Sequence, residues 1–166
     1  EIGSEGNSGM QSAIYFDLIA DLAAGFGVSE AGVRANSKCL SADVNAAFDP
    51  NFPEVCERRN SCFVNGGVVI TKFTGSRGKS GSNDASAEFV GYVRRVLDDA
   101  GVVWQTSELG KVDGGGGGTV AKFIAEKNVD VIDLGVPVIS MHAPYEVVSK
   151  TDVYMTHKAI EAFFRA

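Results

Sequence analysis

The stretch VDVIDLGVP, from Val129 to Pro137, constrains the fold more than any other part of the chain, because it is apolar almost without interruption. Such a run is typical of a strand in the middle of a parallel sheet, where helices bury both faces. Helical patterns stand on both sides of it, one beginning near Thr119 and one capped by Thr151 or Asp152. Strands that alternate with helices predict a three-layer α/β sandwich with a largely parallel central sheet.

Two earlier segments also have the apolar spacing of helices. Within 8–24, Ile14, Leu18 and Leu22 recur at i, i+4 and i+8, and Gly25 is typical of a helix end. The second begins after Asn83 or Asp84, either of which can cap it. The side chains that we expect to be buried are Phe89, Val93, Val96 and Leu97 in this second helix and Val153, Ile160, Phe163 and Phe164 in the last one.

Between the helices, Asn65–Phe73 and Val102–Thr106 have the β-branched content of strands. The stretches 37–59 and 74–84 are rich in turn-forming residues, and we interpret them as loops. No internal repeat or interdomain linker interrupts this order. A length of 166 residues is enough for one domain with a hydrophobic core.

Charge and cysteine content exclude several classes of partner. The formal net charge is -6 and the pI about 4.9, so we expect no nucleic-acid partner. No apolar run reaches the roughly 20 residues needed to span a bilayer, so we expect no membrane partner either. Three cysteines, Cys39, Cys56 and Cys62, are odd in number and lack C-x-x-C spacing. They are interpreted as reduced thiols of a cytoplasmic protein.

The stretch VISMHAPYE places His142, one of two histidines, at the end of an apolar run. An imidazole at a strand end serves as a metal ligand or proton carrier, although these residues alone favour a hydrogen-bonded core histidine. Ligands gather at the strand ends and loops of such sheets, so Glu1 and Asp43 are candidates to join it. This mixed oxygen and imidazole set suits zinc, manganese or cobalt. The other histidine, His157, is expected to face solvent.

Five glycines, 114–118, precede the short helix near Thr119. Glycines before a helix can let a phosphate approach backbone N–H groups. The stretch DGGGGGT nevertheless lacks the lysine of a P-loop and a suitably placed acidic residue. Such a loop also leaves room for an extended peptide to lie against its backbone, and a flexible surface loop fits the composition equally well.

Four stretches, in order and spanning essentially the whole chain, resemble one peptidase family. They are EIGSEGNSG at the start, SADVNAAFDPN at 41–51, ITKFTGSRGKSGSNDASAEF at 70–89 and DLGVPVISMHAPYEV at 133–147. The family is that of aspartyl aminopeptidase and vacuolar aminopeptidase I, with their bacterial relatives. The resemblance implies a metal-dependent hydrolase that removes N-terminal residues from short peptides. It also implies two metal ions, usually zinc, bridged by an aspartate and flanked by histidine and carboxylate ligands.

The resemblance also assigns roles to individual residues. In the family a Glu-Glu pair precedes Ile-Gly-Ser, the first being the general base and the second a metal ligand. Here only Glu1 precedes Ile2, so Glu1 matches the ligand and the general base is missing. Asp43 matches the carboxylate ligand of the other metal, and His142 matches the histidine that shares a metal with Glu1. Lys72, in ITKF, matches a position that contacts substrate.

The family's bridging aspartate, its other histidine and an inserted dimerisation domain lie upstream of the matching region. We therefore expect residues 1–166 to be the C-terminal part of a catalytic metallopeptidase domain, a fragment of a longer polypeptide. By itself the fragment should hydrolyse peptides negligibly and should associate with the missing N-terminal half. The resemblance further implies a homo-oligomer, a dodecamer.

Two departures from the family bear on specificity. Acid-selective relatives carry a histidine where Ala46 stands and a tyrosine where this chain has Gly81 or Ser82. Because fewer donors face an acidic side chain, a neutral or broad preference is expected. Two other functions stay open: a non-catalytic α/β binding piece that retains a partial metal site, and a nucleotide-binding module that uses the glycines.

Overall fold

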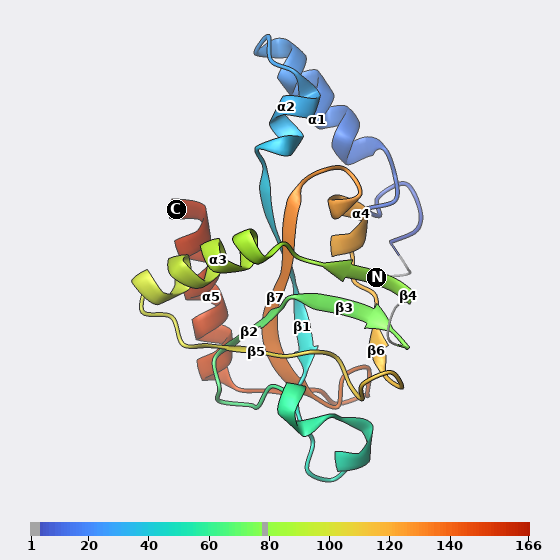
Figure 1. The fold of residues 1–166 in the computed structure, drawn as a ribbon, viewed down its shortest axis with the longest axis vertical. Coiled ribbons are helices and arrows are strands. Elements are labelled where there is room, and N and C mark those ends of the chain that lie inside the picture. Colours follow the sequence, from blue (N-terminus) through green and yellow to red (C-terminus); the bar gives the residue numbers. More distant parts are fainter. Residues whose placement is uncertain (1–3, 78–79) are drawn as a thin grey trace.

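The computed structural model describes residues 4–77 and 80–166, which form a mixed α/β fold around a largely parallel central sheet (Figure 1). The strands of this sheet are β1 (Lys38–Ala46), β2 (Val68–Thr71), β5 (Trp104–Thr106), β7 (Asp130–Ile139) and β8 (Val147–Val148). β7 lies in the middle, parallel to β1 and antiparallel to β2. β5 extends the sheet beyond β2, and β8 pairs with the end of β7.

β7 is the apolar strand that the sequence predicts, and its side chains alternate between two faces. Ile132 and Leu134 face α3 (Ala87–Asp99) and α5 (Lys150–Arg165), with which they form the main core. Val131 points to the opposite face and packs against α4 (Ala121–Ala125). The sheet therefore lies between two helical layers, and the predicted fold class is confirmed.

A second, three-stranded sheet stands beside the first and includes part of the glycine stretch (Figure 1). Its strands are β3 (Phe73–Ser76), β4 (Ser80–Asp84) and β6 (Gly116–Gly117), with β3 in the middle. The loop predicted over 74–84 is thus wrong, because β3 and β4 pair antiparallel there. Their serines and glycines lack the apolar alternation from which strands are recognised. β6 is an edge strand that pairs with β3 among the described residues.

The prediction of a loop over 37–59 is also wrong, because β1 lies within it. Residues 38–46 form a strand that pairs with β7 along its full length. Only the remainder of that stretch is irregular, with 3-10 turns at Pro53–Val55 and Arg58–Asn60. Asp43 therefore lies in a strand and not in a loop.

The predicted core of α3 is confirmed at three of its positions. Phe89, Val93 and Leu97 are each at most 3% exposed. Ser86 caps this helix and Ser149 caps α5, through side-chain oxygens that accept backbone N–H groups. Both caps differ from the residues predicted, by two to three positions in each helix, which is the usual uncertainty of a helix boundary.

α5 buries only part of the face that its sequence predicts, since Phe163 packs against the main core while two other predicted residues are exposed. Val153 and Phe164 are 46% and 82% exposed, whereas Asp152 is 1% exposed. The Asp152 carboxylate accepts the backbone N–H groups of Asn65 at 2.7 Å and Gly67 at 2.9 Å. Because a buried carboxylate needs such partners, these bonds fix which side of the helix faces inward.

α1 (Ile14–Gly25) and α2 (Glu30–Ala35) form a hairpin that projects from one end of the molecule (Figure 1). The predicted end at Gly25 is confirmed. The predicted apolar face is present but uncovered, since Ile14, Leu18 and Leu22 are 64%, 56% and 51% exposed. No described helix has both the length and the hydropathy required to cross a membrane.

Candidate functional site

Asp43 is positioned by the pairing of β1 with β7, where it stands opposite Gly135. A Cβ at position 135 would collide with the Asp43 carbonyl oxygen, so glycine allows the two backbones to approach this closely. The Asp43 side chain is exposed, and its Oδ1 accepts the Val44 backbone N–H at 2.7 Å. This hydrogen bond orients the carboxylate.

His142 lies in the turn that follows β7, the neighbour of β1. Its φ is +66°, and the φ of Ser140, two residues earlier, is +61°. Residues other than glycine rarely adopt this left-handed backbone conformation. Those that do are strained, and they are concentrated at functional sites. Glu146 closes the turn, because its Oε1 accepts the His142 backbone N–H at 2.6 Å. His142 is exposed and is therefore not the core histidine that its local sequence favoured.

Asp43 and His142 line the same groove, which has a volume of about 810 Å³. Small-molecule sites typically have volumes of roughly 300–1,000 Å³. Glu146 adds a second carboxylate to the lining, the glycine segment 116–118 adds bare backbone, and Lys122 of α4 adds a positive charge. The groove thus combines metal-ligand chemistry with room for a peptide-sized molecule.

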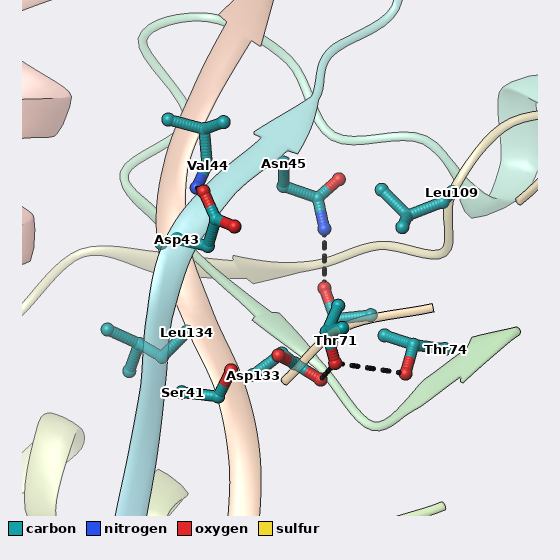
Figure 2. Close-up of a pocket in the computed structure, with 11 residues that line it drawn as sticks. Ser41, Asp43, Val44, Asn45, Thr71, Thr74, Leu109, Asp133 and Leu134 are labelled. Carbon is teal, nitrogen blue, oxygen red and sulfur yellow. Dashed lines mark hydrogen bonds between the residues drawn. The ribbon is translucent and has the colours of Figure 1, made fainter. Parts of the chain in front are cut away.

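Figure 2 shows a cavity of about 20 Å³ that is lined largely by polar residues. It adjoins the groove, and both are lined by Asp43, Val44, Leu109 and Thr119. Asn45 donates from Nδ2 to Thr71 Oγ1 at 2.5 Å across this cavity. Thr119 donates from Oγ1 to Asp133 Oδ2 at 3.0 Å. These bonds join β1, β2, β7 and the end of the glycine stretch, so they fix the floor of the groove.

Asp133 is the most perturbed acid of this cavity and is only 7% exposed. Burial raises its pKa to about 6, and the negative charge of Asp43 adds to the rise, while the hydroxyls of Ser41 and Thr119 lower it. Asp133 Oδ1 and Ser41 Oγ are buried without a well-aligned hydrogen-bond partner among the described residues. Any hydrogen-bonding capacity that remains lies in a cavity with room for about one water molecule.

The predicted site residues are only partly brought together. Glu1 lies outside the described residues. Lys72 pairs with Asp84 of β4 and is not among the described residues that line the groove. Ala46, the departure expected to weaken acid selectivity, does line it.

The metal-binding chemistry is present in part. Within 4–77 and 80–166, no group of three histidine, cysteine or acidic side chains could hold a metal ion. Asp43 and His142 nevertheless bring a carboxylate and an imidazole to one groove, and these are donor types that zinc prefers. The donors fit part of a zinc site, and any further ligand has to come from outside the described residues.

The glycine stretch does not form a phosphate loop. Gly116 and Gly117 belong to a strand, and the next helix begins only at Ala121. A phosphate loop would place its glycines at the start of a helix. The structure therefore does not support the nucleotide-binding alternative, which required the glycines to lie at the start of a helix.

Residues 1–164 match the family model for the aminopeptidase I zinc metalloproteases, M18. The chain belongs to the M18 family. A Clostridium acetobutylicum protein named "Probable M18 family aminopeptidase 1" is 50% identical to this M18 chain over 167 residues. That match covers 98% of this chain and 36% of the relative.

Solved M18 structures agree with the fold. The M18 aminopeptidase of Thermotoga maritima has a TM-score of 0.92 and 42% identity, over 97% of this chain and 37% of its own. The mApe1 dodecamer of Saccharomyces cerevisiae shares the fold with a TM-score of 0.74 and 22% identity, over 99% of this chain and 35% of its own. This M18 chain thus spans little more than a third of the relatives that it matches.

Sequence reasoning missed three polar residues of the groove and its inner cavity. The role of Asp133 could have been inferred, because an acidic residue inside an apolar strand is buried and needs polar partners. Glu146 carried a weaker signal, since it follows His142 by four residues with a proline between them. Lys122 carried none, because a lysine near the start of a helix usually faces solvent.

Proposed function

We propose that this chain is the C-terminal part of the catalytic domain of a zinc aminopeptidase. In the complete polypeptide the enzyme removes N-terminal residues from short peptides. One observation carries the proposal: Asp43 of β1 and His142, in the turn that follows the neighbouring strand β7, line a single peptide-sized groove. Membership of the M18 family supports the same activity.

In this proposal His142 and Glu1 would bind one zinc ion, and Asp43 would bind the other. Zinc, when bound, supplies a Lewis acid that polarises the scissile carbonyl. Cobalt or manganese would suit the same donors. The bridging aspartate, the remaining histidine ligand and the general base belong to the part of the polypeptide outside this chain, as the family resemblance implies.

The chain's own residues orient the reacting groups. The Val44 N–H directs the Asp43 carboxylate, and Glu146 fixes the turn that carries His142. Apolar side chains of Phe123 and Met141 line the groove. They exclude water from a bound peptide, which strengthens every polar contact there because the local dielectric falls.

The preferred substrates have neutral or varied N-terminal residues. Ala46 contributes only a methyl group to the groove wall, so it offers no donor to an acidic side chain. Gly81 likewise has no side chain, and its neighbour Ser82 has only a short hydroxyl. We therefore expect the complete enzyme to hydrolyse leucyl 4-nitroanilide faster than aspartyl 4-nitroanilide.

The central test is substitution of the two ligands in the complete, zinc-loaded polypeptide. His142→Ala and Asp43→Asn should each lower kcat/KM for leucyl 4-nitroanilide at least about a hundredfold, because each removes a ligand from the metal. Zinc content, measured by mass spectrometry, should fall in parallel. A metal chelator should abolish the wild-type activity.

His157→Ala is the matched control, since His157 lies exposed on α5 and outside the groove. It should keep both zinc and activity. If His142→Ala retained full zinc and full turnover, the proposed site would be wrong.

The chain alone should be inactive, because its described residues do not complete a metal site. Adding the N-terminal part of the polypeptide as a second chain should restore turnover. The alternative, a non-catalytic binding piece, predicts some zinc binding with no gain in turnover on that addition. Metal analysis and the leucyl 4-nitroanilide assay on one mixture separate the two.

We also propose a homo-oligomeric, cytoplasmic enzyme. The fold shared with the yeast mApe1 dodecamer supports an oligomer of that kind. The free thiols of Cys39, Cys56 and Cys62 suit a reducing compartment. Burial raises the pKa of the Cys62 thiol to about 11, so this group stays protonated and unreactive at neutral pH.

A further inference from the structure

The groove is lined by a lysine as well as by acidic residues. Among the described residues that line it, Lys122 is the only lysine or arginine, while Asp43 and Glu146 are acidic. Lys122 lies in α4, and its Nζ is 4.5 Å from the centre of the Phe123 ring. A Cβ built on Gly81 of β4 would lie 3.4 Å from the same Nζ. The ammonium group is therefore located between α4 and β4, at the groove wall.

Lys122 has no ion-pair partner within the part of the chain that the structure describes. Its neighbours are an aromatic ring and the main chain near Gly81. An aromatic face attracts an ammonium group but leaves its N–H donors free. A carboxylate that reached this position would gain a charge-assisted hydrogen bond.

The glycine segment 116–118 also lines the groove, as bare backbone. The fold requires glycine at position 116, because φ is +97° and a Cβ would collide with the Gly75 carbonyl oxygen. It does not require glycine at position 117. There φ is ordinary, and the nearest atom to a Cβ is Leu109 Cδ1 at 3.9 Å. The missing side chain leaves a wall along which an extended chain can lie.

β6, which contains Gly116 and Gly117, is the edge of the second sheet. Edge strands present unpaired backbone groups, and extended peptides commonly bind by adding a strand to such an edge. The cavity beneath the groove has a volume of only about 20 Å³ and shares Thr119 with it, so a bound peptide is confined to the groove itself.

We propose that the groove selects short peptides with a free C-terminus, whose backbone runs along Gly116–Gly118 and whose terminal carboxylate binds Lys122. The N-terminal residue then lies toward Asp43 and His142. This proposal rests on the proposed aminopeptidase function and adds a reason for short substrates: one groove binds both ends of the peptide.

The test compares Leu-Gly-Gly with Leu-Gly-Gly amide on the complete, zinc-loaded enzyme. The wild type should hydrolyse the free acid with a kcat/KM about tenfold higher than the amide, mainly through KM. Lys122→Gln should bring the ratio of acid to amide close to one. Lys122→Arg should restore most of the preference, which a merely structural role for the lysine would not explain.

Lys127→Gln is the matched control, because Lys127 follows the same helix, is exposed and does not line the groove. It should leave the ratio unchanged. Equal rates for the acid and the amide on the wild type would overturn the proposal, as would a ratio that Lys122→Gln does not alter.

The glycine wall has a test of its own. Gly117→Ala should raise KM for Leu-Gly-Gly severalfold, whereas Gly114→Ala, which lies outside the groove with ordinary space for a Cβ, should not. Equal KM values for the two variants would show that the bound peptide does not lie against Gly117. Leucyl 4-nitroanilide separates this failure from failure of the aminopeptidase itself, because it has neither a peptide tail nor a C-terminal carboxylate.

Discussion

At the scale of single residues, the candidate site contains residues in energetically unfavourable conformations or environments. His142 has a left-handed backbone, and Asp133 is a buried acid with one oxygen unpartnered among the described residues. Each state lowers stability, and folded proteins keep such features mainly where function needs them. Glu146 and Thr119 offset part of the cost by hydrogen bonding to them.

Asp133 makes a testable contribution to the pH dependence of stability. Its pKa is about 6 in the folded chain and about 3.9 in an unfolded one. Between pH 4 and pH 6 the folded state therefore binds more protons than the unfolded state, so this group lowers the free energy of unfolding as pH rises. Above pH 6 the free energy of unfolding has fallen by the full amount that this group can contribute, roughly 3 kcal/mol.

Asp133→Asn removes this ionisation. In metal-free protein, the variant should gain stability relative to the wild type as pH rises from 4 to 7, as measured by urea unfolding. Asp113→Asn, at an exposed loop acid, should show no such trend. A stability difference for Asp133→Asn that is the same at pH 4 and pH 7 would contradict the assignment.

At the scale of elements, the site depends on how closely β1 and β7 pack. Gly135 of β7 meets the carbonyl of Asp43, so the backbone of one strand positions the candidate ligand on the other. The same pairing places Ser41 opposite Asp133, which brings the buried hydroxyl and carboxyl to one cavity.

Gly135→Ala should therefore push β1 away from β7 at Asp43. We expect a loss of about 3 kcal/mol in the free energy of unfolding, since overpacking a core commonly costs this much, and a matching loss of zinc and peptidase activity. Gly91→Ala is the control, because that glycine lies in α3 with no atom within 4 Å of a new Cβ. It should be neutral or slightly stabilising. Urea unfolding and zinc analysis would measure both.

Sequence reasoning predicted the elements whose apolar residues face the core, and it failed where polar residues face a site. β7 and the buried positions of α3 followed from hydrophobic pattern. β1 did not, although residues 40–46 alternate between apolar and polar, because Ser, Asp and Asn are also common in loops. This alternation indicates a strand, and its polar residues line the inner cavity of the candidate site.

The candidate site was predictable only through the family resemblance. Spacings of tens of residues do not reveal that Asp43 and His142 line one groove, since the β1–β7 pairing that joins them is long-range. Lys122 and the glycine edge could not be inferred at all, because their roles depend on where the second sheet stands beside the first.

At the scale of the whole molecule, the chain exposes an apolar surface on the projecting α1–α2 hairpin. Ile14, Leu18, Leu22 and Phe26 are between 51% and 83% exposed on or beside one helix. Monomeric proteins rarely leave such contiguous patches open. We expect this face to be covered by protein in the complete enzyme.

The isolated chain should therefore self-associate through this face. Light scattering coupled to size-exclusion chromatography should find oligomers at micromolar concentration, and the double variant Leu18→Glu/Leu22→Glu should shift them toward monomer. Val112→Glu, which changes an equally exposed apolar residue in a distant loop, should not. A monomeric wild-type chain would contradict the expectation.

The pairing of β1 with β7 has a consequence for the timing of folding. Lys38 and Asp130 meet in the register, although most of the chain lies between them. Closing so long a loop is entropically costly, and contacts of this kind tend to form late. The groove that Asp43 and His142 line is therefore completed only in the last stages of folding, when the chain is nearly native.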